Sequence, residues 1–292
     1  MTVNAEPTTR TIAAPGATLT YDVRPNDSST EPPLFLIGSP MGAAGFGSLI
    51  GYFPDRTIVT YDPRGSERST KPDMTSQSTP DEHADDLHRV IQEVGGRVDM
   101  FASSGGATNS LALVAKHPED VRSLVAHEPP IATVLPDREH AQGAARAVHE
   151  TYMRHGFGAG MAHFIAVVSH QGEFPDDFAQ RPPPDPAMFG MPNEDDGSRT
   201  DPLMGQTIIG STQFEPDFDA LRAASTRIVM AAGVESEGIM TSRAASAVAE
   251  RLGTMPVIFP SGHNGFMGGE YGQPGGEPEA FAAKLREVLE EG

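Results

Sequence analysis

The sequence predicts an α/β protein built on a largely parallel sheet, with one inserted segment. Short continuous apolar runs, such as residues 34–37 and 57–61, are typical of strands that are buried on both faces. Segments with helical periodicity alternate with these runs, and this alternation implies parallel strands joined by right-handed crossovers. The alternation stops over residues 136–214 and then resumes. We therefore expect a sheet domain formed by residues 1–135 and 215–292, interrupted by an insertion.

Length and composition limit the classes of function. A chain of 292 residues has the size of one α/β domain that carries an insertion, and its net charge is −19. An acidic surface keeps a protein soluble and argues against binding to nucleic acid or to an anionic membrane surface. Because the chain has no cysteine, disulfides, thiolate catalysis and cysteine metal sites are excluded. Residues 1–10 lack a signal-peptide pattern and no run is long enough for a membrane span, so we expect a cytoplasmic protein.

The first half of the chain supplies most of the predicted strands. These are residues 11–13, 19–23, 34–37, 57–61, 98–102 and 123–126. Thr79 is the expected N-cap of a helix that has Pro80 in its first turn, and Gly95-Gly96 ends this helix. A second helix is expected from residue 105 to about residue 116.

The inserted segment, residues 136–214, differs from the rest of the chain. Helical stretches at residues 140–155 and 161–168 precede a proline-rich tract, which we expect to be a mobile loop. Strands and helices alternate again after it: strand 227–231, helix 243–252, strand 256–259 and helix 278–289.

The strongest functional signal is residues 102–106, which read Ala-Ser-Ser-Gly-Gly. They lie between a predicted strand and a predicted helix, and the residues two before and two after Ser104 are small. So tight a turn requires this, and Ser103 fails the test because Phe101 lies two residues before it. The N–H groups that begin the following helix favour a developing oxyanion. Ser104 is the predicted nucleophile, and a turn that only caps a helix is the alternative.

The second signal is Ser261-Gly262-His263, which follows the last predicted strand and precedes the last helix. A histidine in this loop can reach back over the sheet to the serine. Its ordinary pKa of about 6.5 suits a general base. We predict His263 as that base, against the alternative of a surface histidine.

These motifs together resemble the α/β-hydrolase fold family. Residues 61–69, Tyr-Asp-Pro-Arg-Gly-Ser-Glu-Arg-Ser, resemble its Asp-x-Arg-Gly-x-Gly-x-Ser segment, and we expect a structural turn with an Asp–Arg network there. With the loop at residues 34–42, the Ser104 turn and the Gly262-His263 ending, the resemblance covers nearly the whole chain outside the insertion. The family implies a mostly parallel eight-stranded sheet flanked by helices, a helical cap at residues 136–214, and no metal or organic cofactor.

The resemblance also implies an oxyanion hole made of two backbone N–H groups. Gly105, directly after the nucleophile, supplies one of them. The other comes from the first loop, where residues 37–41 read Ile-Gly-Ser-Pro-Met and the family usually has His-Gly-x. Pro40 has no N–H, so Ser39 is the first choice and Met41 the alternative.

Two glutamates are candidates for the acid that orients His263. Many family members have a Gly-x-x-Asp pattern after the strand that follows the cap, but the aspartate position here is Ser236, next to Glu235. The other family location is the end of the strand after the nucleophile helix, where the chain reads His-Glu-Pro-Pro around Glu128. This ending resembles zearalenone-type lactone hydrolases, whose acid is a glutamate at the matching place. Glu128 is therefore the first choice and Glu235 the second.

These residues predict a serine hydrolase that cleaves a carboxylic ester or lactone through an acyl-enzyme on Ser104. The same triad would serve hydrolysis of a carbon–carbon bond, and a non-catalytic ligand-binding protein on this scaffold is a third interpretation. The expected partner is a small, partly apolar substrate, and a homodimer is compatible with the sequence. No metal site is predicted, because His83 and His88 lie five residues apart on one helix, which is not same-face spacing.

Overall fold

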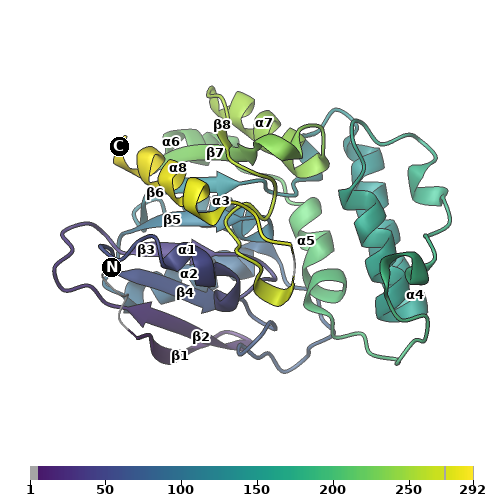
Figure 1. Cartoon of the computed structure of the whole chain (residues 1–292), viewed down its shortest axis with the longest axis horizontal. Coiled ribbons are helices and arrows are strands. Elements are labelled where there is room, and N and C mark those ends of the chain that lie inside the picture. The colour runs from purple at the N-terminus through teal and green to yellow at the C-terminus, as the bar shows by residue number, and fades with distance from the viewer. Residues whose placement is uncertain (1–5, 273, 292) are drawn as a thin grey trace.

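Eight strands form one sheet in the order β1-β2-β4-β3-β5-β6-β7-β8. The computed structural model of the chain (Figure 1) describes residues 6–272 and 274–291. The strands are β1 (Thr8–Ala14), β2 (Ala17–Arg24), β3 (Leu34–Ile37), β4 (Ile58–Asp62), β5 (Val98–Ser103), β6 (Val121–His127), β7 (Arg227–Gly233) and β8 (Val257–Phe259). Strand β2 is antiparallel to β1 and β4, and all other neighbours pair in parallel. This confirms the predicted eight-stranded, mostly parallel sheet.

Helices cover both faces of this sheet. One face packs against α2 (Pro80–Glu93), α3 (Gly105–Lys116), α6 (Phe218–Ala223) and α7 (Met240–Leu252), and the other against α1 (Gly47–Ile50) and α8 (Pro278–Glu290). Side chains of β3 alternate between the two layers: Phe35 and Ile37 belong to the first, and Leu34 and Leu36 to the second. Double-sided burial is the reason why the central strands read as continuous apolar runs.

Local signals set the ends of α2 as predicted. The Thr79 side chain accepts a hydrogen bond from the Glu82 N–H, and the Glu82 carboxylate accepts one from the Thr79 N–H at 2.8 Å. This capping box satisfies two backbone donors at the helix start. The helix stops before Gly95 and Gly96, whose φ angles are 103° and 101°.

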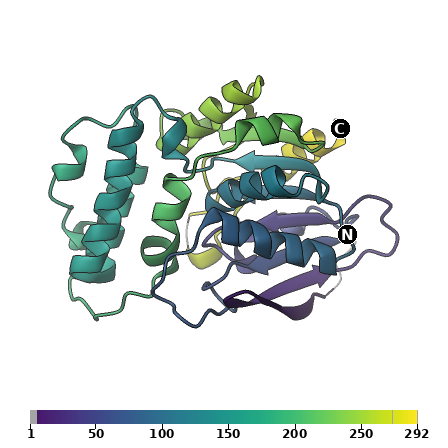
Figure 2. The ribbon, with the colours of Figure 1, turned by 180° about the vertical axis from the view of Figure 1, so that it is seen from behind.

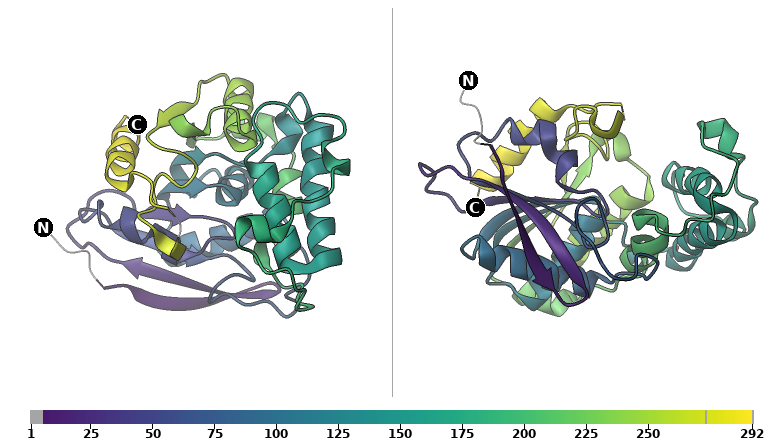
Figure 3. Two further views of the ribbon diagram at one scale, coloured as in Figure 1. Left: turned by 45° about the vertical axis from the view of Figure 1, so that its right-hand side comes forward. Right: turned by 90° about the horizontal axis from the view of Figure 1, so that it is seen from below.

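The inserted segment lies beside the sheet domain and connects β6 to β7 (Figures 1 and 3). Its elements are α4 (Arg138–Val168), η3 (Phe178–Gln180), η4 (Pro186–Phe189), the π-helix η5 (Pro202–Thr207) and α5 (Ile208–Thr212). Both predicted helical stretches are present, and α4 consists of two helical segments that meet at a kink at Gly156, whose φ is 82° and ψ is −172°. A glycine can adopt this conformation without steric cost, so the chain changes direction there and continues as helix. The apolar residues of the segment form a cluster that also contains Met240 and Ala244 of α7.

The first strand is longer than predicted. Strand β1 begins at Thr8, three residues before the expected start, and pairs with β2 from Thr8 opposite Val23. Residues 8–11 are exposed, so no apolar pattern marks them, and backbone pairing at the sheet edge is what orders them. Residues 1–5 lie outside the described part of the chain. No helix among the described residues combines the length and the apolar character that a membrane span requires.

Candidate active site

Ser104 occupies a sharp turn between β5 and α3. Its φ of 57° and ψ of −129° lie in a region that residues with a side chain rarely adopt. A Cβ atom on Gly106 would lie 2.8 Å from the carbonyl oxygen of Ile37, and one on Gly105 would lie 2.6 Å from that of Ser39. The turn is therefore pressed against the end of β3, which explains why both residues after Ser104 are glycine.

The first loop and the Ser104 turn meet at Ser39 and Gly105. The Cβ of Ser39 lies 3.2 Å from the point where a Cβ on Gly105 would be. The N–H of Gly105 is among the four at the start of α3 that have no partner within the helix. The side chain of Met41 turns elsewhere, since it fills the space next to Gly38 and Gly45. Of the two candidates in the loop, Ser39 is thus the residue that contacts the turn.

Glu128 and His263 meet at the same edge of the sheet. Glu128 follows β6 and His263 follows β8, and both strands run in the direction of β5, so their carboxyl ends share the edge that carries Ser104. His263 Nδ1 lies 2.6 Å from Glu128 Oε2. With Nδ1 engaged, Nε2 is the ring nitrogen that remains to accept a proton. Glu128 and Ser261, like Ser104, have positive φ, at 49° and 62°.

Ser104 follows β5, the neighbour of β6, which carries Glu128 at its end. Its N–H donates to the carbonyl oxygen of His127 at 2.9 Å, and His127 is the residue before Glu128. In the part of the chain that the structure describes, no hydrogen bond joins the Ser104 hydroxyl to His263. Such contacts are often long in enzymes without substrate and shorten when the substrate binds.

The carboxyl group of Glu128 is fully buried and ionised. Burial by itself raises the pKa of Glu128, but the hydrogen bond and charge of His263, with smaller effects of His127 and Ser236, lower it to about 2. Oε1 accepts from the Gly233 N–H at 2.8 Å, and Oε2 also accepts from the Thr241 hydroxyl at 3.1 Å. Both oxygens are therefore fixed in place.

Ser236 stands where many family members have an aspartate, and it is buried beside Glu128, whose pKa it helps to lower. Glu235 is exposed, and its carboxylate accepts from the Ser261 hydroxyl at 3.2 Å. Of the two candidate acids, Glu128 is the one that the structure brings to His263.

Asp62 ties the first loop to the sheet. Its Oδ1 accepts from the Ala43 N–H at 2.9 Å, and its Oδ2 accepts from Arg68 Nε at 2.5 Å. This is the Asp–Arg network expected for residues 61–69. Arg64 takes no part in it, because its guanidinium forms a bidentate pair with Asp86 of α2 at 2.7 and 2.8 Å.

Ser211 of α5 approaches the Ser104 turn from the inserted segment. Its Oγ lies 3.3 Å from the point where a Cβ on Gly105 would be, and the residue is 7% exposed. No sequence signal marks Ser211, since a serine in a short helix carries no motif. Only the packing of α5 against α3 brings it there.

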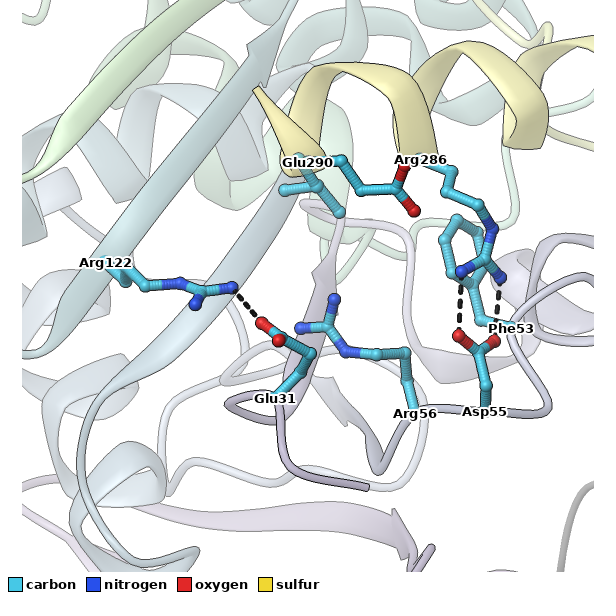
Figure 4. Close-up of a pocket in the computed structure, with 8 residues that line it drawn as sticks. Glu31, Phe53, Asp55, Arg56, Arg122, Arg286 and Glu290 are labelled. Carbon is cyan, nitrogen blue, oxygen red and sulfur yellow. Dashed lines mark hydrogen bonds and ion pairs between the residues drawn. The ribbon is translucent and has the colours of Figure 1, made fainter. Parts of the chain in front are cut away.

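A hollow of about 260 Å³ lies at the opposite edge of the sheet, near the amino ends of β3, β4 and β6 (Figure 4). The residues that line it are Glu31, Phe53, Asp55, Arg56, Arg122, Arg286, Leu289 and Glu290. Its charges largely neutralise one another: Arg286 pairs with Asp55 at 2.7 Å and Arg122 with Glu31 at 2.7 Å. We assign this hollow no part in the chemistry at Ser104.

Known proteins resemble the chain in sequence and in fold. The family described as alpha/beta hydrolase fold matches residues 34–171. The chain is 28% identical over 270 residues to the uncharacterized hydrolase YraK of Bacillus subtilis (strain 168), which covers 88% of this chain and 89% of that protein. It is 35% identical over 95 residues to the 2-(acetamidomethylene)succinate hydrolase of Mesorhizobium japonicum, covering 32% of this chain and 34% of that protein. The solved structure of a thermophilic esterase from Thermogutta terrifontis has a TM-score of 0.64 at 20% identity and covers 98% of this chain and 99% of that chain.

Proposed function

We propose that this chain, which belongs to the α/β-hydrolase fold family, is a serine hydrolase that cleaves a carboxylic ester or lactone. The observation that carries the proposal is the 2.6 Å pair between the buried Glu128 carboxylate and His263 Nδ1. It lies at the edge of the sheet that also holds the Ser104 turn. A hydroxyl, an imidazole and a buried carboxylate in this order are what activation of a serine by a general base requires.

In the proposed reaction, Ser104 Oγ attacks the carbonyl carbon while His263 Nε2 takes the hydroxyl proton. The carbonyl oxygen becomes an oxyanion that accepts hydrogen bonds from the N–H groups of Ser39 and Gly105, and each donor contributes about 3 kcal/mol. The bond between the carbonyl carbon and the alcohol oxygen then breaks, and His263 donates its proton to that oxygen. An acyl-enzyme on Ser104 remains. Water, deprotonated by His263, then releases the acid and restores Ser104. Glu128 holds the ring in the required tautomer and stabilises the imidazolium.

The inserted segment, residues 136–214, is proposed to be a cap that selects the substrate. It is held against the sheet domain by the hydrogen bonds from the Ser78 N–H to the Gln206 carbonyl oxygen, at 2.9 Å, and from Thr133 Oγ1 to the Phe214 carbonyl oxygen, at 2.5 Å. These contacts support a fixed position for Ser211 beside Gly105, where its hydroxyl would meet the substrate carbonyl.

Hydrolysis of a non-ester substrate is the second candidate. The partial similarity to a 2-(acetamidomethylene)succinate hydrolase favours it, since that substrate name contains an amide and carboxylates but no ester. Ser104, His263 and Glu128 would also serve hydrolysis of such a substrate. They would likewise serve the hydrolysis of a carbon–carbon bond, which the sequence leaves open as an alternative.

A combined labelling and turnover experiment tests the proposal. A fluorophosphonate probe should label Ser104, identified by mass spectrometry, and a panel of p-nitrophenyl esters and simple lactones should report the preferred acyl group. Ser104→Ala should lower ester turnover by about 10⁴-fold or more, whereas the neighbouring control Ser103→Ala should stay within about tenfold of wild type. Equal turnover in wild type and Ser104→Ala would exclude the mechanism. Labelling of Ser104 without turnover of any ester or lactone would favour the second candidate.

A further inference from the structure

We propose that His88, His117 and Asp120 form a binding site for a divalent transition-metal ion of the Zn²⁺ class. His88 lies on α2, His117 directly follows α3, and Asp120 comes three residues later, just before β6. One potential ligand atom from each residue lies within 4.8 Å of the other two. The proposal is independent of the proposed function.

The cluster is remote from the Ser104 turn. Helix α3 begins at Gly105 and ends at Lys116, so its 12 residues place His117 about 18 Å from the turn. Helices α2 and α3 lie side by side on one face of the sheet, as Figure 2 shows from behind. An ion held between them would therefore lie at the end of α3 that is far from the proposed chemistry.

The side chains already lie together as a set of nitrogen and oxygen donors. The rings of His88 and His117 are stacked with centroids 3.9 Å apart and planes inclined by 16°. His88 Nδ1 lies 2.6 Å from Asp120 Oδ2, and His117 Nδ1 lies 3.5 Å from Glu119 Oε1. Two imidazoles and one or two carboxylates suit Zn²⁺, which takes four such ligands at about 2.0–2.2 Å. The ion would take the place of the hydrogen bond between His88 Nδ1 and Asp120 Oδ2.

The carboxylate of Asp120 is held in position from behind. Asp120 is 1% exposed, and its Oδ1 accepts from Gln92 Nε2 at 2.8 Å. The Asp120 N–H also donates to the carbonyl oxygen of His117 at 3.1 Å, which fixes the turn that carries both ligands. An outer partner of this kind orients a metal ligand, and its removal typically weakens binding by about 10- to 100-fold.

Access and charge also favour a cation here. The side chains of His88 and His117 are 32% and 27% exposed, so an ion can reach them and the rings can adjust. The neighbouring cation Lys116 pairs with Asp85 at 2.6 Å rather than with this cluster. A hydrogen bond between His88 and Asp120 alone would link α2 to the turn. The second imidazole, stacked on His88, adds a further nitrogen donor.

Titration of the chelator-treated, dialysed, tag-free full chain with Zn²⁺ tests the proposal by calorimetry, and Co²⁺ absorbance gives a second readout of the same ligands. We expect saturation at one equivalent. His117→Ala and His117→Gln should weaken binding by at least tenfold, and Gln92→Leu by about 10- to 100-fold. The matched control is His140→Ala, because His140 also lies near a carboxylate, that of Asp176 at 3.5 Å, but outside the cluster. It should bind as wild type does.

The proposal is overturned if wild type shows no saturable one-to-one binding, or if both His117 variants bind as tightly as wild type. Circular dichroism and ester turnover of the same samples keep the result separate from the proposed function. His117 lies outside the proposed catalytic residues, so its variants should retain wild-type turnover while losing the ion.

Discussion

Replacement of Glu128 by glutamine isolates what the buried negative charge contributes to the proposed triad. The amide keeps the shape of the side chain. Its oxygen can still accept from the Gly233 N–H, which in wild type lies 2.8 Å from Glu128 Oε1. Its NH₂ group then takes the place of Oε2, 2.6 Å from His263 Nδ1, and donates to that nitrogen. The ring proton is forced onto Nε2, which can no longer accept the proton of Ser104.

The expected result is a loss of about 10⁴-fold in kcat, or about 5.4 kcal/mol at 1.36 kcal/mol for each factor of ten. Initial rates on p-nitrophenyl acetate measure it, with Glu235→Gln as the matched control. Glu235 is exposed and accepts from the Ser261 hydroxyl, so its substitution should change kcat by less than about tenfold. The assignment of the acid would be refuted by Glu128→Gln retaining more than a tenth of wild-type kcat, or by a larger loss in Glu235→Gln.

Three further substitutions test the turn, the cap and a buried histidine. Gly106→Ala puts a Cβ 2.8 Å from a backbone oxygen and should slow fluorophosphonate labelling by about 10²-fold; unchanged labelling would contradict the packing argument. Ser211→Ala should lower kcat about tenfold with little change in KM if its hydroxyl donates to the oxyanion; a change in KM alone would assign Ser211 to substrate binding. Burial, with smaller effects of Arg64 and Lys71, lowers the pKa of His83 to about 3. In the unfolded chain the His83 ring is protonated below about pH 6.5, whereas in the folded protein it stays neutral, so stability falls as the pH falls. Between pH 6.5 and 5, the unfolding free energy of wild type should decrease by about 2 kcal/mol more than that of His83→Leu. Parallel pH slopes of the two proteins in urea unfolding would disprove this.

Most of the sheet and the Ser104 turn follow from local sequence. Strands buried on both faces read as apolar runs. The small residues Ala102 and Gly106, on either side of Ser104, indicate the tight turn. The preference for Glu128 over Glu235 rested on a resemblance, and the 2.6 Å contact with His263 gives it a physical basis.

The features that the sequence does not predict depend on contacts between distant segments. Strand β1 has exposed residues over 8–11 and is ordered by backbone pairing, which leaves no trace in hydrophobicity. Ser211 reaches the Ser104 turn only because α5 packs beside it. The pairing of His88 with His117 and Asp120 joins a helix to a turn 29 to 32 residues away, so a search for ligands spaced along one helix could not detect it.

The positive φ angles of Ser104, Glu128 and Ser261 imply that the edge of the sheet proposed to carry the chemistry lowers the stability of the fold. Each such residue costs roughly 1–3 kcal/mol, which the well-packed layers on both faces of the sheet must offset. A glycine relaxes that conformation, so Ser104→Gly should melt at a higher temperature than wild type while being inert. Selection for thermal stability alone would therefore favour glycine at position 104.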